Sequence, residues 1–211
     1  MQNNNLLKKM LLALIVCVAA PCANAQMAHV GDILCEGDLI VSPANYNANT
    51  FTAIGVVFYV DNTGQHGWAV ALQDAGSYAW GCDGSDMPIP NYGNRRQAIY
   101  DLDGYENTRI VREHCSGNTA FYAVDFANGW YVPAIGQLNY LYGNLGEVNA
   151  TLVKIGGTPF VGGWEYWSST ECSTYNAWYL SSSGELGNNL NYGNGDSYKY
   201  NSRRVRGVRA F

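Results

Sequence analysis

Charge is scarce in this 211-residue sequence: charged residues make up 14% of it, with 12 Lys and Arg against 17 Asp and Glu. The formal net charge is −5, and a net acidic chain is a poor general partner for nucleic acid, whose phosphates attract basic surfaces. A hydrophobic content of 47% is typical of a folded protein rather than of a chain kept unfolded by its charge. Together with 24 glycines, these values indicate one globular domain rich in turns.

Motifs for catalysis are missing. There is no His-Glu-x-x-His and no Gly-x-Ser-x-Gly, so neither a zinc hydrolase nor a serine hydrolase is indicated. The three histidines are scattered: His29, His66 and His114. We therefore predict a protein that is not an enzyme and that carries no cofactor.

No apolar run of bilayer-spanning length stands at the N-terminus. Lys8 and Lys9 are followed by the apolar run Met10–Ala20, which has 11 residues and is too short to cross a bilayer. Small residues then occupy positions 23–25. This pattern is typical of a secretory signal peptide over residues 1–25, with cleavage before Gln26 and a mature chain of residues 26–211. We therefore expect a secreted or cell-surface protein without a transmembrane helix.

The cysteines leave alternatives open. Cys22 allows a lipid-modified N-terminus, although Pro21 stands where a small residue is expected before a lipidated cysteine. An even number of cysteines remains in the mature chain, which is compatible with up to two disulfides and three pairings. Their spacings match no metal pattern: Cys35, Cys82, Cys115 and Cys172.

Patterning predicts a single α+β domain with strands at both ends and helices in the middle. Strands are predicted at Asp38–Ser42, Ala53–Val60, Gly67–Leu72, Tyr166–Ser169, Ala177–Ser181, Leu186–Tyr192 and Arg204–Ala210. Helices are predicted after Asn107 as N-cap, and at Thr119–Phe126, Ala134–Tyr142 and Glu147–Ile155. Gln73–Asn94 is predicted to be a long surface loop, because it is rich in Gly, Pro, Asp and Asn and lacks periodicity.

The run Ser173–Ser202 has the composition of a recognition surface. Ser, Tyr, Asn and Gly account for 21 of its 30 residues. Tyrosine offers contact area at low entropy cost, and Ser, Asn and Gly offer adaptable hydrogen bonds. The same residues also form ordinary solvated loops. We predict that a protein or glycan ligand binds here, at Tyr175, Asn176, Tyr179, Asn189, Asn191, Tyr192, Asn194, Asp196, Tyr198 and Tyr200.

Arginines gather at the C-terminus of this acidic chain. They could hold sulfated sugars or phosphates, or they could pair with carboxylates of their own domain. We predict the second role for Arg203, Arg204, Arg206 and Arg209.

Four signatures occur in a specific order: Asp103–Thr108, Trp130–Pro133 with Gln137, Tyr166–Glu171 followed by Ala177-Trp178, and Val205–Phe211. In this order they resemble a secreted bacterial domain family with a C-type lectin-like fold, named for the C-terminal domain of a Legionella collagen-like protein. The resemblance implies a mixed sheet in which the N- and C-terminal strands pair, flanking helices, and a long ligand-binding loop region. It also implies that Trp167 and Trp178 are buried. Gln137 stands where the family usually has Glu.

Calcium, which many lectins of this fold use, is not expected here. The signatures Glu-Pro-Asn, Gln-Pro-Asp and Trp-Asn-Asp are absent. Asp101, Asp103 and Glu106 lie close together but lack the spacing of an EF-hand loop. We predict a turn and a helix cap at these acids and no metal site.

Proteins of this fold include the variable proteins of diversity-generating retroelements, whose C-terminal region is rewritten at template adenines. The residue types from Tyr175 to Asn201 resemble that spectrum. We therefore expect an exported, non-catalytic domain for adhesion or recognition, with retroelement diversification as a further hypothesis. The alternative is a structural subunit or domain of a cell-surface appendage. The sequence does not indicate an oligomeric state.

Overall fold

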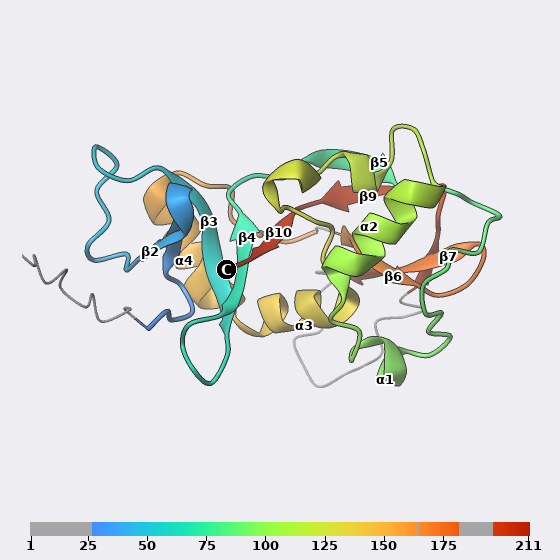
Figure 1. Cartoon of the computed structure of the whole chain (residues 1–211), viewed down its shortest axis with the longest axis horizontal. Coiled ribbons are helices and arrows are strands. Elements are labelled where there is room, and N and C mark those ends of the chain that lie inside the picture. The colour runs from blue at the N-terminus through green and yellow to red at the C-terminus, as the bar shows by residue number, and fades with distance from the viewer. Residues whose placement is uncertain (1–26, 164, 182–195) are drawn as a thin grey trace, which may run out of the picture.

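The computed structural model describes residues 27–163, 165–181 and 196–211 (Figure 1). The predicted signal peptide, Cys22 and the predicted strand Leu186–Tyr192 lie outside these residues. In the described part, strands of two β-sheets lie at both ends of the chain and the α-helices lie between them, so the predicted α+β class is confirmed.

The first sheet has five strands in the order β10-β4-β3-β1-β2, and neighbouring strands are antiparallel. Their bounds are β1 Ile33–Cys35, β2 Leu39–Val41, β3 Ala53–Val60, β4 Gly67–Ala71 and β10 Val208–Ala210. The β-branched run predicted at Ala53–Val60 forms β3 with the predicted bounds.

The second sheet has the order β5-β9-β6-β7-β8 and is mixed, because β6 and β9 run parallel. Its strands are β5 Gly76–Ala79, β6 Glu165–Glu171, β7 Asn176–Ser181, β8 Asp196–Tyr198 and β9 Ser202–Val205. β8 lies at one end of the sheet, beside β7.

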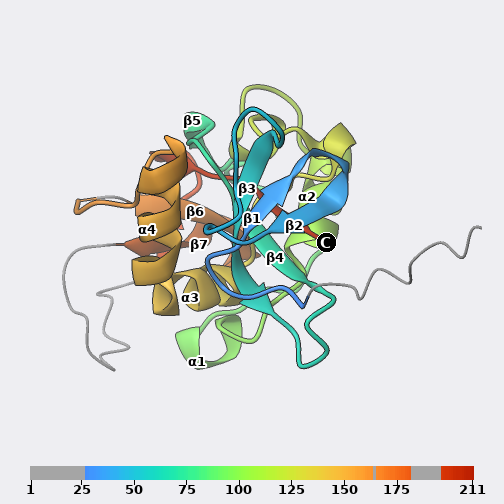
Figure 2. The same ribbon diagram turned by 90° about the vertical axis from the view of Figure 1, so that its left-hand side faces the viewer.

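Helices pack against both sheets. They are α1 Arg95–Ala98, α2 Gly104–His114, α3 Ile135–Gly143 and α4 Leu145–Ile155. Figure 2 shows α3 and α4 on the same side of the first sheet. Val148 and Leu152 of α4 share an apolar cluster with Val56, Phe58 and Val70 of that sheet. The amphipathic pattern that predicted α4 is therefore the pattern that packs it.

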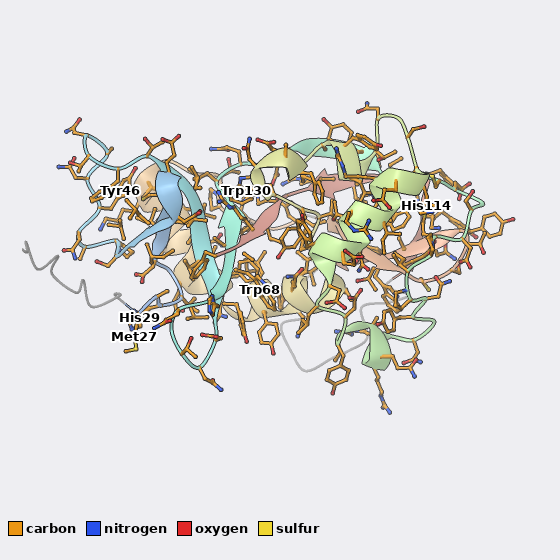
Figure 3. All side chains as sticks on the ribbon, in the orientation of Figure 1. Met27, His29, Tyr46, Trp68, His114 and Trp130 are labelled. Atoms are coloured by element: carbon orange, nitrogen blue, oxygen red, sulfur yellow. A yellow bond between two sulfur atoms is a disulfide. The ribbon has the colours of Figure 1, made fainter. Side chains whose placement is uncertain are left out.

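Aromatic residues reinforce this packing. Trp68 of β4 stacks on Tyr59 of β3 with 4.3 Å between ring centroids, and it lies 5.9 Å from Tyr140 of α3 (Figure 3).

A second apolar cluster lies under the other sheet and includes Trp80 and Trp167. Trp167 is fully buried and Trp178 is 6% exposed, so the predicted burial of these two tryptophans is confirmed.

The predicted pairing of the chain ends is wrong. β10 pairs with β4, and β3 and β4 separate it from β1. The predicted strand Arg204–Ala210 is likewise two strands in two sheets, β9 and β10. The chain changes sheets at Arg206 and Gly207: the side chain of Arg206 is buried and pairs with Asp74, and the carbonyl of Gly207 accepts a hydrogen bond from Ala71.

Gln73–Asn94 is not a surface loop throughout. It contains β5, and its apolar residues enter the second cluster, with Trp80 fully buried and Met87 and Ile89 5% and 7% exposed. The segment lacks periodicity because single side chains, rather than one face of a regular element, reach the core.

Two helix predictions also need correction. The N-cap of α2 is Asp103 rather than Asn107, which is buried inside the helix. Its side chain is held there by a hydrogen bond to Asp101. Thr119–Phe126 is not one helix, because two short 3-10 turns, Ala120–Tyr122 and Phe126–Asn128, are separated by a non-helical Asp125.

None of the helices in the described ranges is long and apolar enough to cross a membrane.

Candidate functional site

The predicted binding residues that the structure describes lie on and beside the β7–β8 pair. Asn176 of β7 pairs with Tyr198 of β8, and Tyr179 lies further along β7. Tyr175 precedes β7. For Asp196 only the backbone, in β8, is described, and the other predicted residues lie outside the described part of the chain: Asn189, Asn191, Tyr192 and Asn194.

Three consecutive residues at the end of β8 have opposite environments. Tyr198 is 51% exposed and Tyr200 is 60% exposed, whereas Lys199 between them is fully buried. The two tyrosine rings are parallel, with 5.3 Å between their centroids and an angle of 10°. They therefore lie on one side of the chain. Only Tyr198 belongs to β8, and the turn that follows it, in which the amide of Asn201 donates to the carbonyl of Tyr198 at 2.9 Å, brings Tyr200 beside it. We call Tyr198, Tyr200 and the neighbouring Asn176 the tyrosine platform.

Tyr175 does not belong to this platform. Its carbonyl accepts a hydrogen bond from the Lys199 amide, and the β7–β8 register sets it opposite Lys199 rather than opposite Tyr198. Its ring, which is 55% exposed, lies beside Gly84. Tyr179 is half-buried, because its ring packs under the guanidinium of Arg203 at 3.4 Å. The predicted set is thus divided between two faces of the strand pair.

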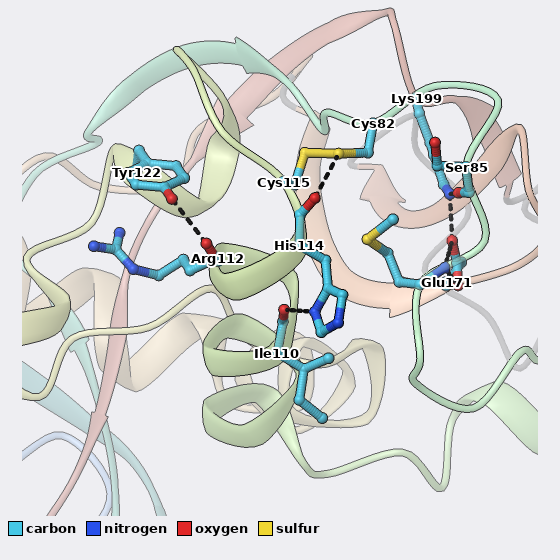
Figure 4. The surroundings of a disulfide bond; sticks show 10 residues. Cys82, Ser85, Ile110, Arg112, His114, Cys115, Tyr122, Glu171 and Lys199 are labelled. Atoms are coloured by element: carbon cyan, nitrogen blue, oxygen red, sulfur yellow. Dashed lines mark hydrogen bonds and ion pairs between the residues drawn. A yellow bond between two sulfur atoms is a disulfide. The ribbon is translucent and has the colours of Figure 1, made fainter.

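The buried side chain of Lys199 holds the backbone of the tyrosine platform in place. Its ammonium group pairs with the carboxylate of Glu171, and it donates a hydrogen bond to the carbonyl of Ser85 at 2.8 Å (Figure 4). It also lies 4.8 Å from the ring centre of Trp80. The Trp80 amide in turn donates to the Lys199 carbonyl at 2.9 Å. A buried ammonium group that has both charge and hydrogen-bond partners holds its backbone in one position.

Glu171 lies at the end of β6 and is fully buried. Burial raises the pKa of its carboxyl group, while the hydrogen bond from Lys199, its charge and the amide of Met87 act in the opposite direction. Both carboxylate oxygens accept from that amide, at 3.3 and 3.2 Å. The ion pair therefore joins β6, the segment around Met87 and the end of β8.

A disulfide holds the loop that contains Cys82. Cys82 and Cys115 are bonded and connect this loop to the end of α2 (Figure 4). It is one of the bridges that the cysteine count allows. Cys35 and Cys172 are thiols, the first in β1 of the other sheet and the second directly after β6.

The C-terminal arginines pair with carboxylates of their own domain, so this prediction is confirmed. Asp74 receives two of them, with Arg206 at 2.6 Å and Arg204 at 3.7 Å. The remaining ion pairs are Arg203 with Glu165 and Arg209 with Asp38.

The acids near the start of α2 have a structural role, and one of them is the centre of a buried hydrogen-bond network. Asp101 is 5% exposed, and its carboxylate accepts hydrogen bonds from the side chains of Asn107 at 3.0 Å and Thr170 at 2.7 Å. The amide of Asp103 also donates to it, at 3.0 Å. This carboxylate joins the beginning of α2 to β6. Among the described residues, no group of three His, Cys, Asp or Glu could hold a metal ion.

Gln137 is also structural. Its amide oxygen accepts from the backbone of Ala134 at 3.0 Å, and its amide nitrogen donates to the hydroxyl of Tyr131 at 3.0 Å. A neutral amide supplies both a donor and an acceptor at this 1%-exposed position.

The comparisons with known proteins give a fold likeness. Neither a protein-family model nor a curated protein matches the sequence. Among solved structures, the fold is similar to that of a fimbrial protein from Bacteroides ovatus, with a TM-score of 0.62 over 87% of this chain and 18% sequence identity. This chain spans 49% of the length of that fimbrial protein.

Proposed function

We propose that this chain is an exported, non-enzymatic protein that recognises a protein or a glycan through the tyrosine platform. The observation that carries the proposal is the contrast at positions 198–200, where two exposed tyrosines flank a fully buried lysine. Both tyrosines are more than half exposed, yet the Lys199 backbone between them is anchored by hydrogen bonds. Rigid, exposed tyrosines are typical of binding surfaces and of their energetic hot spots.

The proposal includes two further statements, one on the protein family and one on diversification of the sequence. The first is membership of the C-type lectin-like family, which rests on the order of the four sequence signatures. The second is diversification of the segment from Tyr175 to Asn201 by a retroelement, which rests on its residue types. A reverse transcriptase gene and a near-identical template repeat beside the coding sequence would support the second statement. Their absence from the gene neighbourhood would remove it.

A binding screen tests the proposed function. The mature chain, immobilised, would be exposed to a glycan array and to solubilised surface proteins, and each ligand found would be re-measured with a Tyr198→Ala/Tyr200→Ala variant. Tyr100, which is 80% exposed and lies outside the platform, provides the matched control as Tyr100→Ala. Binding lost in the first variant and kept in the second supports the platform. Equal binding by all three proteins would refute it.

The second candidate is a structural subunit of a cell-surface appendage, and the likeness to a fimbrial protein favours it. A subunit requires contacts with other subunits rather than a free ligand. Gel filtration and electron microscopy of the purified chain separate the two candidates. Filaments that form without any ligand would support the appendage subunit, whereas a monomer that binds a ligand from the screen would support recognition.

Export is part of both candidates. We expect mass spectrometry of the mature protein to find Gln26 at its N-terminus. A diacylglycerol adduct on Cys22 would instead show a lipid anchor.

A further inference from the structure

We infer that a groove lined by Trp130, remote in sequence from the tyrosine platform, is a second ligand site that takes one ring of a neutral sugar. The groove lies where the chain passes from the first sheet to the second, and Trp130 lies beside the upper end of β4 in Figure 3. Its volume is about 350 Å³, within the range of small-molecule sites. Each lining residue belongs to the described part of the chain, and the inference does not depend on the proposed function.

The groove combines an apolar wall with a polar rim. Trp130, Ala71 and Val124 contribute apolar surface, and Asp125 and Gln73 contribute the polar groups. A few polar groups around an apolar pocket are the usual arrangement of a small-ligand site, because they orient a ligand that apolar contacts retain.

Asp125 and Trp130 are fixed relative to each other by the turn between them. The carbonyl of Asp125 accepts hydrogen bonds from the amides of Asn128 at 3.1 Å and Trp130 at 3.2 Å. Gly129 closes the turn with a φ of 82°, which glycine adopts without strain. The side chain of Asn128 donates to one carboxylate oxygen of Asp125 at 2.7 Å. The acid and the indole are thus positioned before any ligand arrives.

Small residues let the indole lie close to the backbone of the first sheet. A Cβ added at Gly55 in β3 would lie 3.1 Å from Cη2 of Trp130 and 2.9 Å from the carbonyl oxygen of Val70, which is too close for a real side chain. A Cβ at Gly207 would lie 3.3 Å from a methyl group of Val124. Glycine inside a strand marks a place where another group approaches the backbone closely. Here that group is the wall of the groove.

The chemistry of the lining selects the class of ligand. The groove is open to solvent, so a wholly apolar ligand would leave part of its surface in water. A sugar ring has an apolar face of C–H groups for the indole and hydroxyl groups for the rim. A hydroxyl that donates to the Asp125 carboxylate makes a charge-assisted hydrogen bond. Asp125 is the only charged residue in the lining, so an anionic sugar should bind less well than a neutral one.

Indole N–H resonances provide an internally controlled test. The N–H groups of Trp80, Trp167 and Trp178 are hydrogen-bonded to backbone carbonyls of Ser168, Tyr78 and Tyr92, at 2.8, 2.9 and 2.8 Å. During titration of the isotope-labelled mature chain with methyl glycosides of neutral hexoses, we expect the Trp130 indole signal to move saturably. These three signals should stay in place. Methyl glucuronide, an anionic comparison, should give a smaller shift at the same concentration.

Two variants connect the shift to the groove. Ala71→Leu places a larger side chain in the groove and should abolish the shift, and Ala123→Leu repeats the test at another lining residue if the first variant does not fold. Asp125→Asn should weaken binding about tenfold, as expected for the loss of one charge-assisted hydrogen bond. The Tyr198→Ala/Tyr200→Ala variant should leave the shift unchanged. No saturable shift with any neutral glycoside, or an unchanged shift in a folded groove-filling variant, would overturn the inference.

Discussion

The two sheets are held in place by different interactions. In the first sheet, Val56, Phe58 and Val70 pack against apolar residues of α4. Around the second sheet, apolar packing is supplemented by two ion pairs with a deeply buried member: Lys199 with Glu171, and, where the chain passes between the sheets, Arg206 with Asp74. Apolar burial is not directional, whereas an ion pair fixes particular atoms relative to one another. The difference indicates that the ion pairs around the second sheet fix the position of its edge strand, β8, more exactly than apolar packing alone would.

The buried ion pair near the platform is not a simple source of stability. Removing a carboxylate and an ammonium group from water costs free energy, and their attraction restores it only where hydrogen bonds complete the geometry. Here Ser85 and Met87 supply those hydrogen bonds. We therefore regard the pair as an element that specifies position, and this view predicts a different response to mutation than an apolar contact would give.

The largest expected effect comes from breaking this pair on one side. Lys199→Met leaves the Glu171 carboxylate buried without its cation and should lower the free energy of unfolding by about 3–5 kcal/mol. The double variant Glu171→Leu/Lys199→Met removes both charges and should recover most of that loss. Urea denaturation measures each value.

A substitution in the apolar core under the first sheet provides a comparison for the ion-pair variants. Leu152→Ala in α4 should cost about 2–5 kcal/mol, because it leaves a cavity under the first sheet. A loss below about 1 kcal/mol for Lys199→Met, together with no recovery in its double variant, would contradict a positional role for the pair.

Removal of the disulfide comes next in size. Cys82 and Cys115 close a loop across a sequence separation of 33 residues. The double variant Cys82→Ala/Cys115→Ala should lose about 2–4 kcal/mol, because the unfolded chain regains freedom. Thermal denaturation with and without reductant checks this. A wild-type protein that melts at the same temperature under both conditions would show that the bridge does not stabilise the fold.

Alkaline pH should destabilise the fold. Burial raises the pKa of Tyr131 and of Tyr166 to about 12, from the ordinary tyrosine value of 10.0. The raised pKa values give a contribution to stability that is fully present below pH 10.0 and is lost as the pH rises to about 12. We expect the denaturation midpoint to fall across this interval. In Tyr166→Phe the fall should be smaller, since that phenol no longer ionises.

Much of the fold could be predicted from the sequence, because some elements carry a complete local signal. The β-branched run of β3 and the helical spacing in α3 and α4 are examples. The burial of Trp80 could not be predicted this way, because its segment has no regular period. The division between β9 and β10 depends on the pairing of Arg206 with Asp74, which is 132 residues away.

The sequence predicts which residue types form the candidate site, but not how they are arranged. The sequence indicates the tyrosines, but not that Tyr175 and Tyr198 lie on different faces, since this depends on the register of β7 and β8. The buried Lys199 was missed because it stands within a polar run and its partner Glu171 is 28 residues away. A signal was present in retrospect: Lys199 is the one basic residue in the otherwise neutral and acidic run Ser173–Ser202.

The smallest expected effect on stability comes from the platform itself. Tyr198→Ala/Tyr200→Ala removes exposed rings and should change the free energy of unfolding by less than about 1 kcal/mol, as surface substitutions usually do. The contrast with Lys199→Met separates the exposed tyrosines from the anchor between them. A loss comparable to that of Lys199→Met would show that the rings belong to the core of the fold.

The most direct test of the account measures the affinity of a partner from the binding screen for three proteins: wild type, Tyr198→Ala/Tyr200→Ala, and Tyr100→Ala. We predict that all three melt at nearly the same temperature. We further predict that the double variant alone binds at least about thirtyfold more weakly, as expected when a hot spot worth about 2 kcal/mol is removed. Undiminished affinity of the folded double variant would contradict the assignment of the tyrosine platform as the recognition surface.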